Sequence, residues 1–390
     1  MNIEDRIARR RRTGDRHRLV LDEDALSPVW HPPEPVDRGA LVERLLDHLD
    51  AVFDGERPPN GYLRGPGGTG KSAVTAALVD RLSEALPPPG EALFTTTRGG
   101  SASGVSFVRV DLREADSAFE FAHAVLDGLV SDAVPRSGVG TDEIHGRLER
   151  RVRGGGPVVV VADHVGEPET VDVATVADRL EAVDGPFAWL AIGRPAPDDV
   201  AVPEGTPVID VEPYSRATLT DLLAARADAG LGQGALSHSA IRRIAEWADG
   251  DAGVALSALL GAVEVAGEDG AVDDDAVDAG MAAVPWPCVP AGRVLALPAN
   301  RVRTLACLVA LDPDERAPVG DCAARIAGRL DLTASTVERF LYELAEAGIV
   351  ERVRVDDHEG PGRPPSRVDP RFATLAFRAL FNRRFATPAV

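Results

Sequence analysis

Lysine is almost absent from this chain. Of its 42 basic residues only Lys71 is a lysine, and the rest are arginine. Cysteine is scarce too: Cys288, Cys307 and Cys322 form no CxxC pair, which argues against a disulfide framework or a zinc site and predicts a reducing, cytoplasmic compartment. Apolar runs such as residues 158–162 are far too short to span a bilayer, so no membrane association is expected.

Positive charge is also in short supply. The net charge is −20, and such an acidic, lysine-poor composition resembles proteins of salt-accumulating archaea, although GC-rich codon usage also replaces lysine with arginine. Residues 1–20 form a basic arm with seven arginines against three acids, and residues 301–390 carry 14 arginines against 13 acids. Any nucleic acid is therefore expected to contact the ends of the chain. A disordered, solvated tail is the simpler interpretation of the arm, which lacks the apolar stretch of a secretory signal.

Strand and helix patterns alternate in the first half of the chain. The expected strands are residues 60–65, 105–111, 157–163 and 186–193. The expected helices are residues 39–53, 73–86 and about 170–183. The alternation predicts an α/β fold with a parallel sheet buried on both faces. Residues 215–283 have a purely helical pattern, and residues 300–390 read as helices followed by two strands around a Gly/Pro loop.

The single lysine lies in a glycine-rich motif. Residues 65–72 read GPGGTGKS and fit G-x-x-x-x-G-K-[ST], between a predicted strand and a predicted helix. Such a loop wraps backbone N–H groups around the β-phosphate of a nucleotide, and the helix N-terminus adds its dipole. Lys71 would place a compact charge between the β- and γ-phosphates, where the planar fork of arginine is no substitute, and Ser72 would bind Mg²⁺. The predicted nucleotide-binding residues here are Gly65, Pro66, Gly67, Gly68, Thr69, Gly70, Lys71, Ser72 and Ala73. A glycine-rich helix entry without a ligand is the alternative.

Several further segments resemble the archaeal origin-recognition-type (cell-division-control-like) replication initiators of the AAA+ class. Residues 32–49 resemble the family's entry segment, with Pro35 and Arg38 placed like its short box before the first helix. VEPYSRATLTDLLAARADAGLGQGALS at 211–237 and IRRIAEWADGDAGVALSALLGAVEVA at 241–266 resemble its helical lid, and the tail resembles its winged helix. The resemblance covers most of the chain.

This resemblance implies a fold, cofactors and partners. The expected parts are the basic arm at 1–20, an AAA+ nucleotide-binding base at 21–205, a helical lid at 206–283 and a winged-helix domain at 284–390. The family binds ATP or ADP with Mg²⁺ between base and lid, which adds Tyr214 to the nucleotide-binding residues. It binds duplex origin DNA through the winged helix and helps to load the replicative helicase, so a helicase or other initiator paralogues are the expected protein partners.

Four elements that act in ATP hydrolysis depart from the family pattern. Asp163 keeps the strand acid that binds Mg²⁺, but His164 replaces the following glutamate that orients the attacking water. Arg194 aligns near the polar residue after the next strand, no arginine lies between it and Arg216, and the lid motif ends in Gly253 instead of arginine. Because the phosphate loop is intact, nucleotide binding is predicted to survive these changes better than turnover.

The sequence therefore favours an initiator-like protein that uses ATP·Mg²⁺ as a conformational clamp, with weak or absent hydrolysis. An active ATPase with Glu167 as a substitute base is one alternative, and Arg194 would then supply part of the lost charge. A transcriptional or signalling AAA+ switch is another. A small-molecule kinase would leave the lid and the tail unexplained. The segment after Asp163 is also shorter than in the family, which places a helical DNA contact there in doubt.

The tail predicts a DNA-binding helix. Residues 335–338 read STVE, a capping-box pattern, and Gly348 is placed where a helix ends. The residues expected to face the core are Val337, Phe340, Leu341 and Leu344. The predicted DNA contacts are Ser335, Thr336 and Arg339 in the major groove, and Arg363 and Arg367 on phosphate or in the minor groove. Three glutamates share the helix, so a winged helix that contacts only proteins is the alternative.

Overall fold

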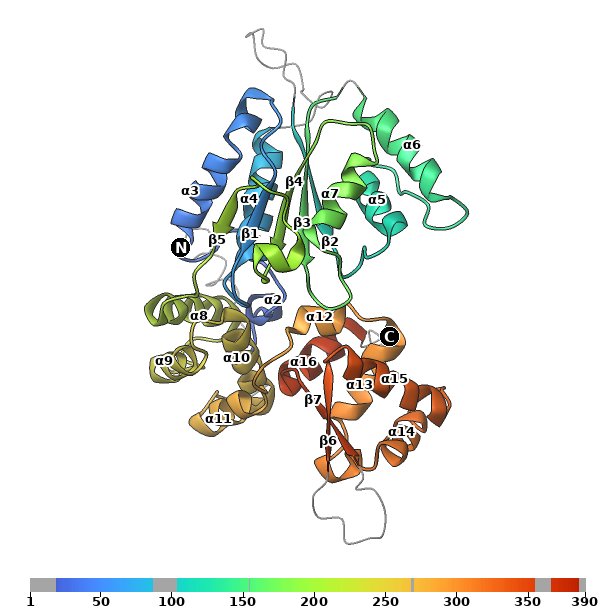
Figure 1. The fold of residues 1–390 in the computed structure, drawn as a ribbon. Helices are drawn as coiled ribbons and strands as arrows, with labels where there is room; N and C mark the ends of the chain where they lie inside the picture. The colour runs from blue at the N-terminus through green and yellow to red at the C-terminus, as the bar shows by residue number, and fades with distance from the viewer. Residues whose placement is uncertain (1–18, 87–103, 154, 268–269, 355–365, 386–390) are drawn as a thin grey trace. The chain divides into compact units, whose positions relative to one another are not determined.

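The computed structural model describes residues 19–86, 104–153, 155–267, 270–354 and 366–385. The chain divides into two compact units. One is His31–Pro213, and the other combines the residues up to Trp30 with those from Tyr214 onward. We refer to them as the base unit and the helical unit, and describe each by itself (Figure 1).

Five parallel strands form the sheet of the base unit, counted over its described residues. They are β1 (Gly61–Arg64), β2 (Ser106–Asp111), β3 (Val158–Val165), β4 (Phe187–Gly193) and β5 (Val208–Asp210). The order across the sheet is β2-β3-β4-β1-β5, so β4 lies between β1 and β3. The predicted α/β fold with a parallel sheet is confirmed.

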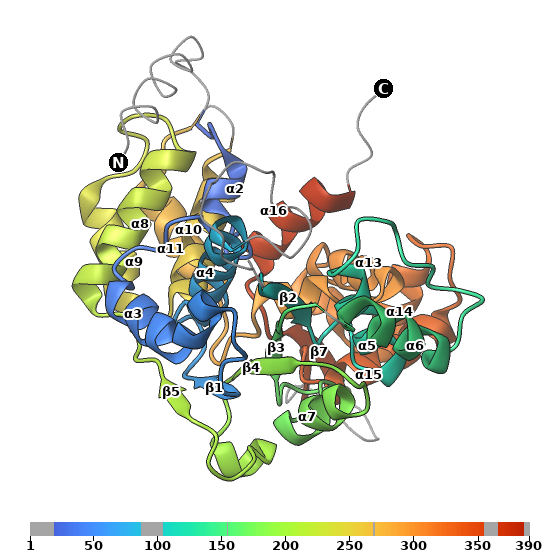
Figure 2. The ribbon, with the colours of Figure 1, turned by 90° about the horizontal axis from the view of Figure 1, so that it is seen from above.

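Helices cover both faces of this sheet (Figure 2). They are α3 (Gly39–His48), a 3₁₀ turn η1 (Asp50–Asp54), α4 (Lys71–Ala85), α5 (Ala118–Asp127), α6 (Thr141–Val152), α7 (Val173–Glu181) and η2 (Pro197–Val200). On β3, Val159 and Val161 pack with α3 and α4, whereas Val158 and Val160 pack with α5, α6 and α7. Because successive strand residues face opposite sides, two buried faces produce the continuous apolar run seen in the sequence.

The helical unit contains the segment that resembles a lid. Its helices are α2 (Glu23–Leu26), α8 (Arg216–Gly230), α9 (His238–Trp247), α10 (Ala252–Ala266) and α11 (Asp274–Ala282). Helix α10 is buried over most of its length. Arg226 on α8 is buried and donates a hydrogen bond to the carbonyl of Ser27 at 2.5 Å, with its guanidinium over the ring of Trp30. The residues around α2 are thereby tied to α8.

The same unit contains the C-terminal helices and hairpin. They are α12 (Ala291–Leu295), α13 (Ala299–Val309), η3 (Pro313–Arg316), α14 (Val319–Ala327), α15 (Ala334–Glu346), β6 (Val350–Arg354), β7 (Ser366–Pro370) and α16 (Thr374–Phe385). Three helices followed by an antiparallel strand pair is the element order of a winged helix. The last helix, α16, packs on α10, where Arg378 contacts Glu264 at 3.1 Å.

The structure of α15 confirms one prediction made from the sequence and contradicts another. Val337, Phe340, Leu341 and Leu344 are buried as predicted, and Gly348 has a positive φ of 69° after the helix. The predicted capping box at 335–338 is wrong, because the N-cap is Thr333, whose hydroxyl accepts a hydrogen bond from the backbone N–H of Thr336 at 3.3 Å. Thr333, two residues before Ser335, is also a favourable N-cap and begins the helix earlier, so Ser335 lies exposed within the first turn.

Candidate nucleotide-binding site

Three strands of the base unit end side by side at one edge of the sheet. Val165 at the end of β3 is paired with Gly193 of β4, and Gly193 is paired with Arg64 of β1. Neighbouring strands lie about 4.8 Å apart, so the loops that follow these three residues are adjacent. The loops carry the glycine-rich motif after Arg64, Arg194 after Gly193 and Glu167 shortly after Val165.

The glycine-rich loop curls around the side chain of Lys71. Lys71 is buried, and its Nζ donates hydrogen bonds to the carbonyls of Gly65 at 2.7 Å and Pro66 at 2.6 Å and to Oγ1 of Thr69 at 3.2 Å. Gly68 and Gly70 adopt positive φ angles of 65° and 82°, which suit glycine. Helix α4 begins at Lys71 itself, two residues earlier than predicted.

The start of α4 is built without a side-chain cap. Its N-cap is Gly70, and no side chain caps the first backbone N–H groups of the helix. A Cβ added at Gly65 would collide with the carbonyl of Val211, so the loop packs directly on the segment after β5. Uncapped N–H groups, a buried ammonium and a helix dipole on one short loop are chemically suited to a phosphate group.

Asp163 and His164 end the regular part of β3. Asp163 Oδ1 accepts a hydrogen bond from the backbone N–H of His164 at 2.8 Å, and about a fifth of the Asp163 side chain is exposed. His164 has a φ of 69°, which is unusual for a residue other than glycine, and the pairing register with β4 shifts between Ala162 and Val165. His164 Nδ1 lies 3.5 Å from Glu167 Oε1.

Glu167 is held by two arginines from neighbouring strands. Arg113, which follows β2, donates from Nε to Glu167 Oε2 at 2.9 Å and from Nη2 to Oε1 at 3.0 Å, and both side chains are less than 10% exposed. Arg194 Nη2 lies 3.4 Å from the same Oε1. The sequence interpretation missed Arg113; a charged residue directly after a predicted strand was the available signal.

This arrangement makes Glu167 a weak base. Burial by itself would raise the pKa of Glu167, but the hydrogen bond from His164 and the charges of Arg113 and Arg194 outweigh it and hold the pKa at about 2. A general base is most effective when its pKa lies near the working pH. A bidentate carboxylate with a pKa of about 2 is poorly placed to accept a proton from water.

Arg194 is positioned by the strand before it. Its side chain is 40% exposed, whereas the loop that follows is fixed by Tyr62, whose buried hydroxyl donates to the carbonyl of Pro195 at 3.0 Å. A Cβ added at Gly193 would lie 2.6 Å from the Tyr62 hydroxyl and 2.8 Å from the carbonyl of Val165. Only glycine fits this point, and Arg194 therefore leaves the sheet beside the phosphate loop in a defined direction.

The lid residues named from the sequence lie in the helical unit. Tyr214 is buried, and its backbone N–H donates to the carbonyl of Gly250 at 3.2 Å. Asp251 caps α10 by accepting from the N–H of Val254 at 2.9 Å, and Gly253 lies within the first turn of that helix. The GDA motif thus forms the turn that starts α10, and Gly253 brings no side-chain cation to it.

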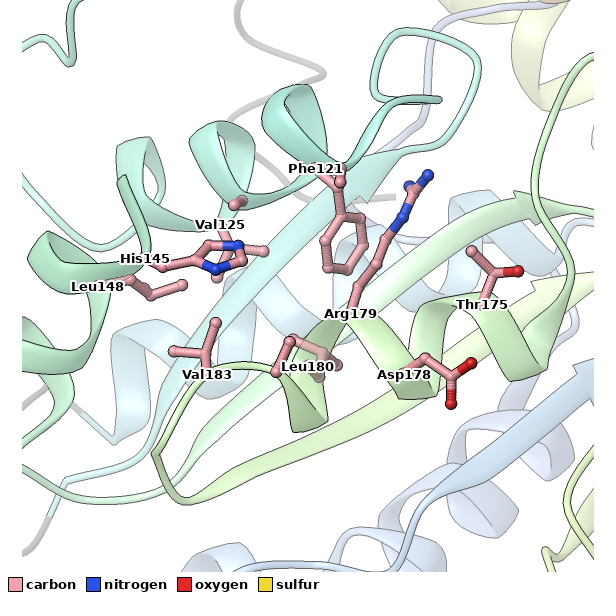
Figure 3. A pocket seen from close by; sticks show the side chains of 12 residues that line it. Phe121, Val125, His145, Leu148, Thr175, Asp178, Arg179, Leu180 and Val183 are labelled. Carbon is pink, nitrogen blue, oxygen red and sulfur yellow. The ribbon is translucent and has the colours of Figure 1, made fainter. Parts of the chain in front are cut away.

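An apolar cavity of about 200 Å³ lies elsewhere in the base unit, between α5, α6 and α7 (Figure 3). Phe121, Leu148 and Val183 contribute to its wall. Arg179 at its rim is already engaged, since it donates to the carbonyl of Asp116 and lies over the Phe121 ring. Few polar groups converge on this cavity, and it lies on the sheet face opposite α4. It is a weaker candidate than the phosphate loop.

Some of the residues predicted to contact DNA are exposed, and others already contact neighbouring side chains of the protein. Ser335 and Arg339 are exposed on α15, although Arg339 Nε lies 3.7 Å from Glu343. The Arg367 guanidinium is held by Asp369 through contacts of 2.8 to 2.9 Å, and the carboxylate raises the pKa of Arg367. Thr336 is half-buried beside the Thr333 cap. Arg363 lies outside the described residues.

The sequence of this chain is similar to those of known proteins, both in a family model and in individual relatives. Residues 34–184 match the family model described as AAA ATPase domain. The chain is 27% identical over 273 residues to ORC1-type DNA replication protein 1 of Sulfurisphaera tokodaii, an alignment that covers 66% of this chain and 64% of that protein. It is 26% identical over 261 residues to ORC1-type DNA replication protein 1 of Halobacterium salinarum, which covers 65% of this chain and 78% of the relative.

Over about two thirds of its length, this chain is similar in sequence to proteins named ORC1-type DNA replication proteins. The resemblance predicted from the sequence is thus confirmed. The alignment spans less than two thirds of the length of the Sulfurisphaera protein, so activity and partners do not follow from it.

Solved structures show the same fold. The Aeropyrum pernix ORC1 protein, solved in complex with DNA, superposes with a TM-score of 0.59 at 22% identity and covers 94% of this chain and 97% of that one. Cdc6p of Pyrobaculum aerophilum gives a TM-score of 0.51 at 19% identity, covering 94% and 98%. No helix among the described residues is long and apolar enough to cross a membrane.

Proposed function

We propose that this protein binds ATP or ADP with Mg²⁺ as a conformational clamp, hydrolyses ATP weakly or not at all, and binds duplex DNA. The proposal rests on a contrast between two groups at the same edge of the sheet. The phosphate loop around Lys71 is complete, whereas Glu167, the one alternative base, is fixed by Arg113 and Arg194.

The residues present fit a nucleotide phosphate. Gly65 to Ala73 would supply the backbone cradle and Lys71 the compact charge, with Tyr214 as the proposed contact from the lid. ATP would bring the negative charge that the uncapped start of α4 lacks. Arg194, half-exposed at the same edge, would add a second cation beside the phosphates.

Mg²⁺ would be bound through few protein ligands. Among the described residues no group of three His, Cys, Asp or Glu side chains could hold a metal ion by itself. Mg²⁺ usually keeps several waters and uses one or two protein oxygens together with substrate phosphates. Ser72, half-buried at the start of α4, and Asp163, partly exposed near the end of β3, would supply such a pair.

Weak hydrolysis follows from what surrounds Asp163. His164 stands where a carboxylate would orient water, and its backbone is turned into the left-handed region. Against the effect of burial, which raises it, the hydrogen bond with His164 and the charges of Arg113 and Arg194 hold the pKa of Glu167 well below its usual range. The loss of one charge that stabilises the transition state of phosphoryl transfer costs about 10³-fold or more in rate.

DNA binding is proposed through α15 and the hairpin of the helical unit. Support comes from the element order, from the exposed Ser335 and Arg339 on α15, and from the relatives, which are named as DNA replication proteins. A replicative helicase or other initiator paralogues remain the proposed protein partners. A purely regulatory switch would use the same elements at other DNA sites.

Calorimetric titration of ATP·Mg²⁺ into wild type and Lys71→Ala tests the binding half of the proposal. We expect saturable binding to wild type and at least a tenfold loss in the variant. The matched control is Arg81→Ala, which removes an exposed cation from the same helix and should bind as wild type does. Equal binding to all three proteins, or none to wild type, would refute the clamp.

A further inference from the structure

Arginines in the C-terminal part of the helical unit differ in whether a carboxylate already holds them. Arg367 is clamped by Asp369, and Arg339 lies near Glu343. Arg352 and Arg371, by contrast, have no carboxylate within 4.0 Å among the residues that the structure describes. An arginine that already neutralises a carboxylate must give up that contact to bind a phosphate, and Arg352 and Arg371 make no such contact with the part of the chain that the structure describes.

These two arginines line a groove between α15 and β6. The groove has a volume of about 370 Å³, and Tyr342 and Glu346 line it from α15. The Arg352 guanidinium lies 4.8 Å above the centre of the Tyr342 ring. Arg371 follows β7, and its backbone N–H donates to the carbonyl of Ile349 at 3.0 Å. Stacking on Tyr342 holds Arg352 in place without using its N–H donors.

The groove continues the exposed face of α15. Ser335, Arg339, Tyr342 and Glu346 follow one another at helical spacing of three or four residues, so they form one stripe along the helix. Tyr342 also donates from its hydroxyl to Glu338 Oε1 at 3.1 Å, which fixes the ring. A duplex lying along the proposed contacts at Ser335 would therefore meet the groove with its next backbone phosphates.

The hairpin register separates the two kinds of arginine. Arg352 is paired with Val368, which is fully buried, so its stem lies on the hairpin face that packs on α15. Arg367 is paired with Val353, and Asp369 with Glu351, on the opposite face. Glu351 also lines the groove, whereas Asp369 already holds Arg367 through contacts of 2.8 to 2.9 Å, so Arg367 is less available to a phosphate than Arg352 is.

We propose that the groove lined by Tyr342, Arg352 and Arg371 binds a backbone phosphate of duplex DNA. The proposal rests on the DNA binding proposed above and assigns the phosphate contact to residues that the sequence pattern did not single out. A phosphate contact positions the protein without reading sequence, so its effect is the same on all duplexes. Glu346 and Glu351 also line the groove and weaken the contact, so removing either carboxylate should strengthen binding.

The test is fluorescence anisotropy of the full chain with a labelled duplex over a KCl series. We expect Arg352→Gln with Arg371→Gln to lower the slope of log K against log salt by about 1 unit, because the loss of one phosphate contact removes about 0.9. Arg339→Gln and Arg367→Gln should lower it less. Glu346→Gln should raise the affinity.

Two controls keep the outcomes separate. Arg242→Gln removes an exposed arginine of α9 and should leave the slope unchanged, and thermal unfolding of every variant checks the fold. If wild type binds no duplex, both the proposed DNA binding and this site fall. If wild type binds and the Arg352 and Arg371 variant keeps the wild-type slope, only the site is refuted.

Discussion

At the scale of single residues, a buried ion pair lies at the edge of the sheet beside the phosphate loop. Such a pair is not expected in a site that hydrolyses ATP, because it fixes the carboxylate that would act as the base. Arg113 and Glu167 share two hydrogen bonds and are both nearly buried. Removing one partner of such a pair leaves an uncompensated buried charge. The pair therefore stabilises the loop after β3 in a form in which Glu167 is fixed.

Replacing Arg113 tests this view of the pair. Arg113→Leu should lower the free energy of unfolding by about 3 kcal/mol, because Glu167 would remain buried without its bidentate partner and keep only the longer contacts with Arg194 and His164. The matched control is Arg109→Leu on β2, the strand before Arg113; the contact of Arg109 with Asp80 at 3.4 Å is exposed, and its loss should cost about 1 kcal/mol or less. Urea unfolding measures both. Equal losses of unfolding free energy in the two variants would show that the buried Arg113–Glu167 pair contributes no more than the exposed contact of Arg109.

The depressed pKa of Glu167 predicts a pH dependence. A folded pKa of about 2, below the ordinary glutamate value of 4.5, means that ionised Glu167 stabilises the fold above pH 4.5 and that this contribution is lost as the pH falls toward 2. Glu167→Gln should be less stable than wild type at pH 7, by on the order of 3 kcal/mol at most. The difference should shrink as the pH falls from 4.5 to 2. A constant difference between the two unfolding curves would contradict the pKa.

At the scale of elements, the sequence predicted the regular and buried parts best. The strands β3 and β4 were visible as apolar runs, because a parallel strand covered on both faces has little polar alternation, and β2 was expected at residues 105–111. The short β5 was missed, since three residues carry almost no periodicity. The phosphate loop was predicted from the spacing of its motif and from the strand and helix expected on either side, whereas the Arg113–Glu167 pair joins residues 54 positions apart, and no local pattern reveals their contact.

The start of α15 gives a prediction for a single element. Thr333→Ala should destabilise the helical unit by about 1 kcal/mol, because it leaves the N–H of Thr336 without its cap. Ser335→Ala, at the position that the sequence pattern favoured, should cost little. Thermal unfolding compares the two variants. A larger loss for Ser335→Ala would restore the capping box predicted from the sequence.

At the scale of the whole molecule, the lid-like helices and the C-terminal helices form one compact unit. Gly261 of α10 lies at their meeting point, since an added Cβ would be 3.3 Å from both Gly280 of α11 and Leu375 of α16. Arg383 of α16 also contacts Glu23 of α2 at 2.8 Å. These contacts predict that lid and tail unfold together, separately from the base unit.

A substitution at Gly280 tests that prediction. A Cβ at Gly280 would collide with the carbonyl of Ala258 and lie 2.6 Å from the backbone nitrogen of Ala262, so Gly280→Ala should lower the stability of the helical unit by several kcal/mol. Hydrogen exchange should then speed up together in α10, α11 and α16 and stay unchanged in β3 and β4. Gly320→Ala on α14, where an added Cβ meets open space, is the control. Faster exchange confined to α10 and α11 would contradict a single unit.

The central claim is that this protein holds ATP without efficiently cleaving it, and single-turnover hydrolysis of radiolabelled ATP at saturating protein, with and without duplex DNA, tests it most directly. We predict bound ATP that remains intact over many minutes in wild type, with phosphate release no faster than in Lys71→Ala. Rapid phosphate release from wild type that Glu167→Gln abolishes would contradict the account and establish Glu167 as the catalytic base.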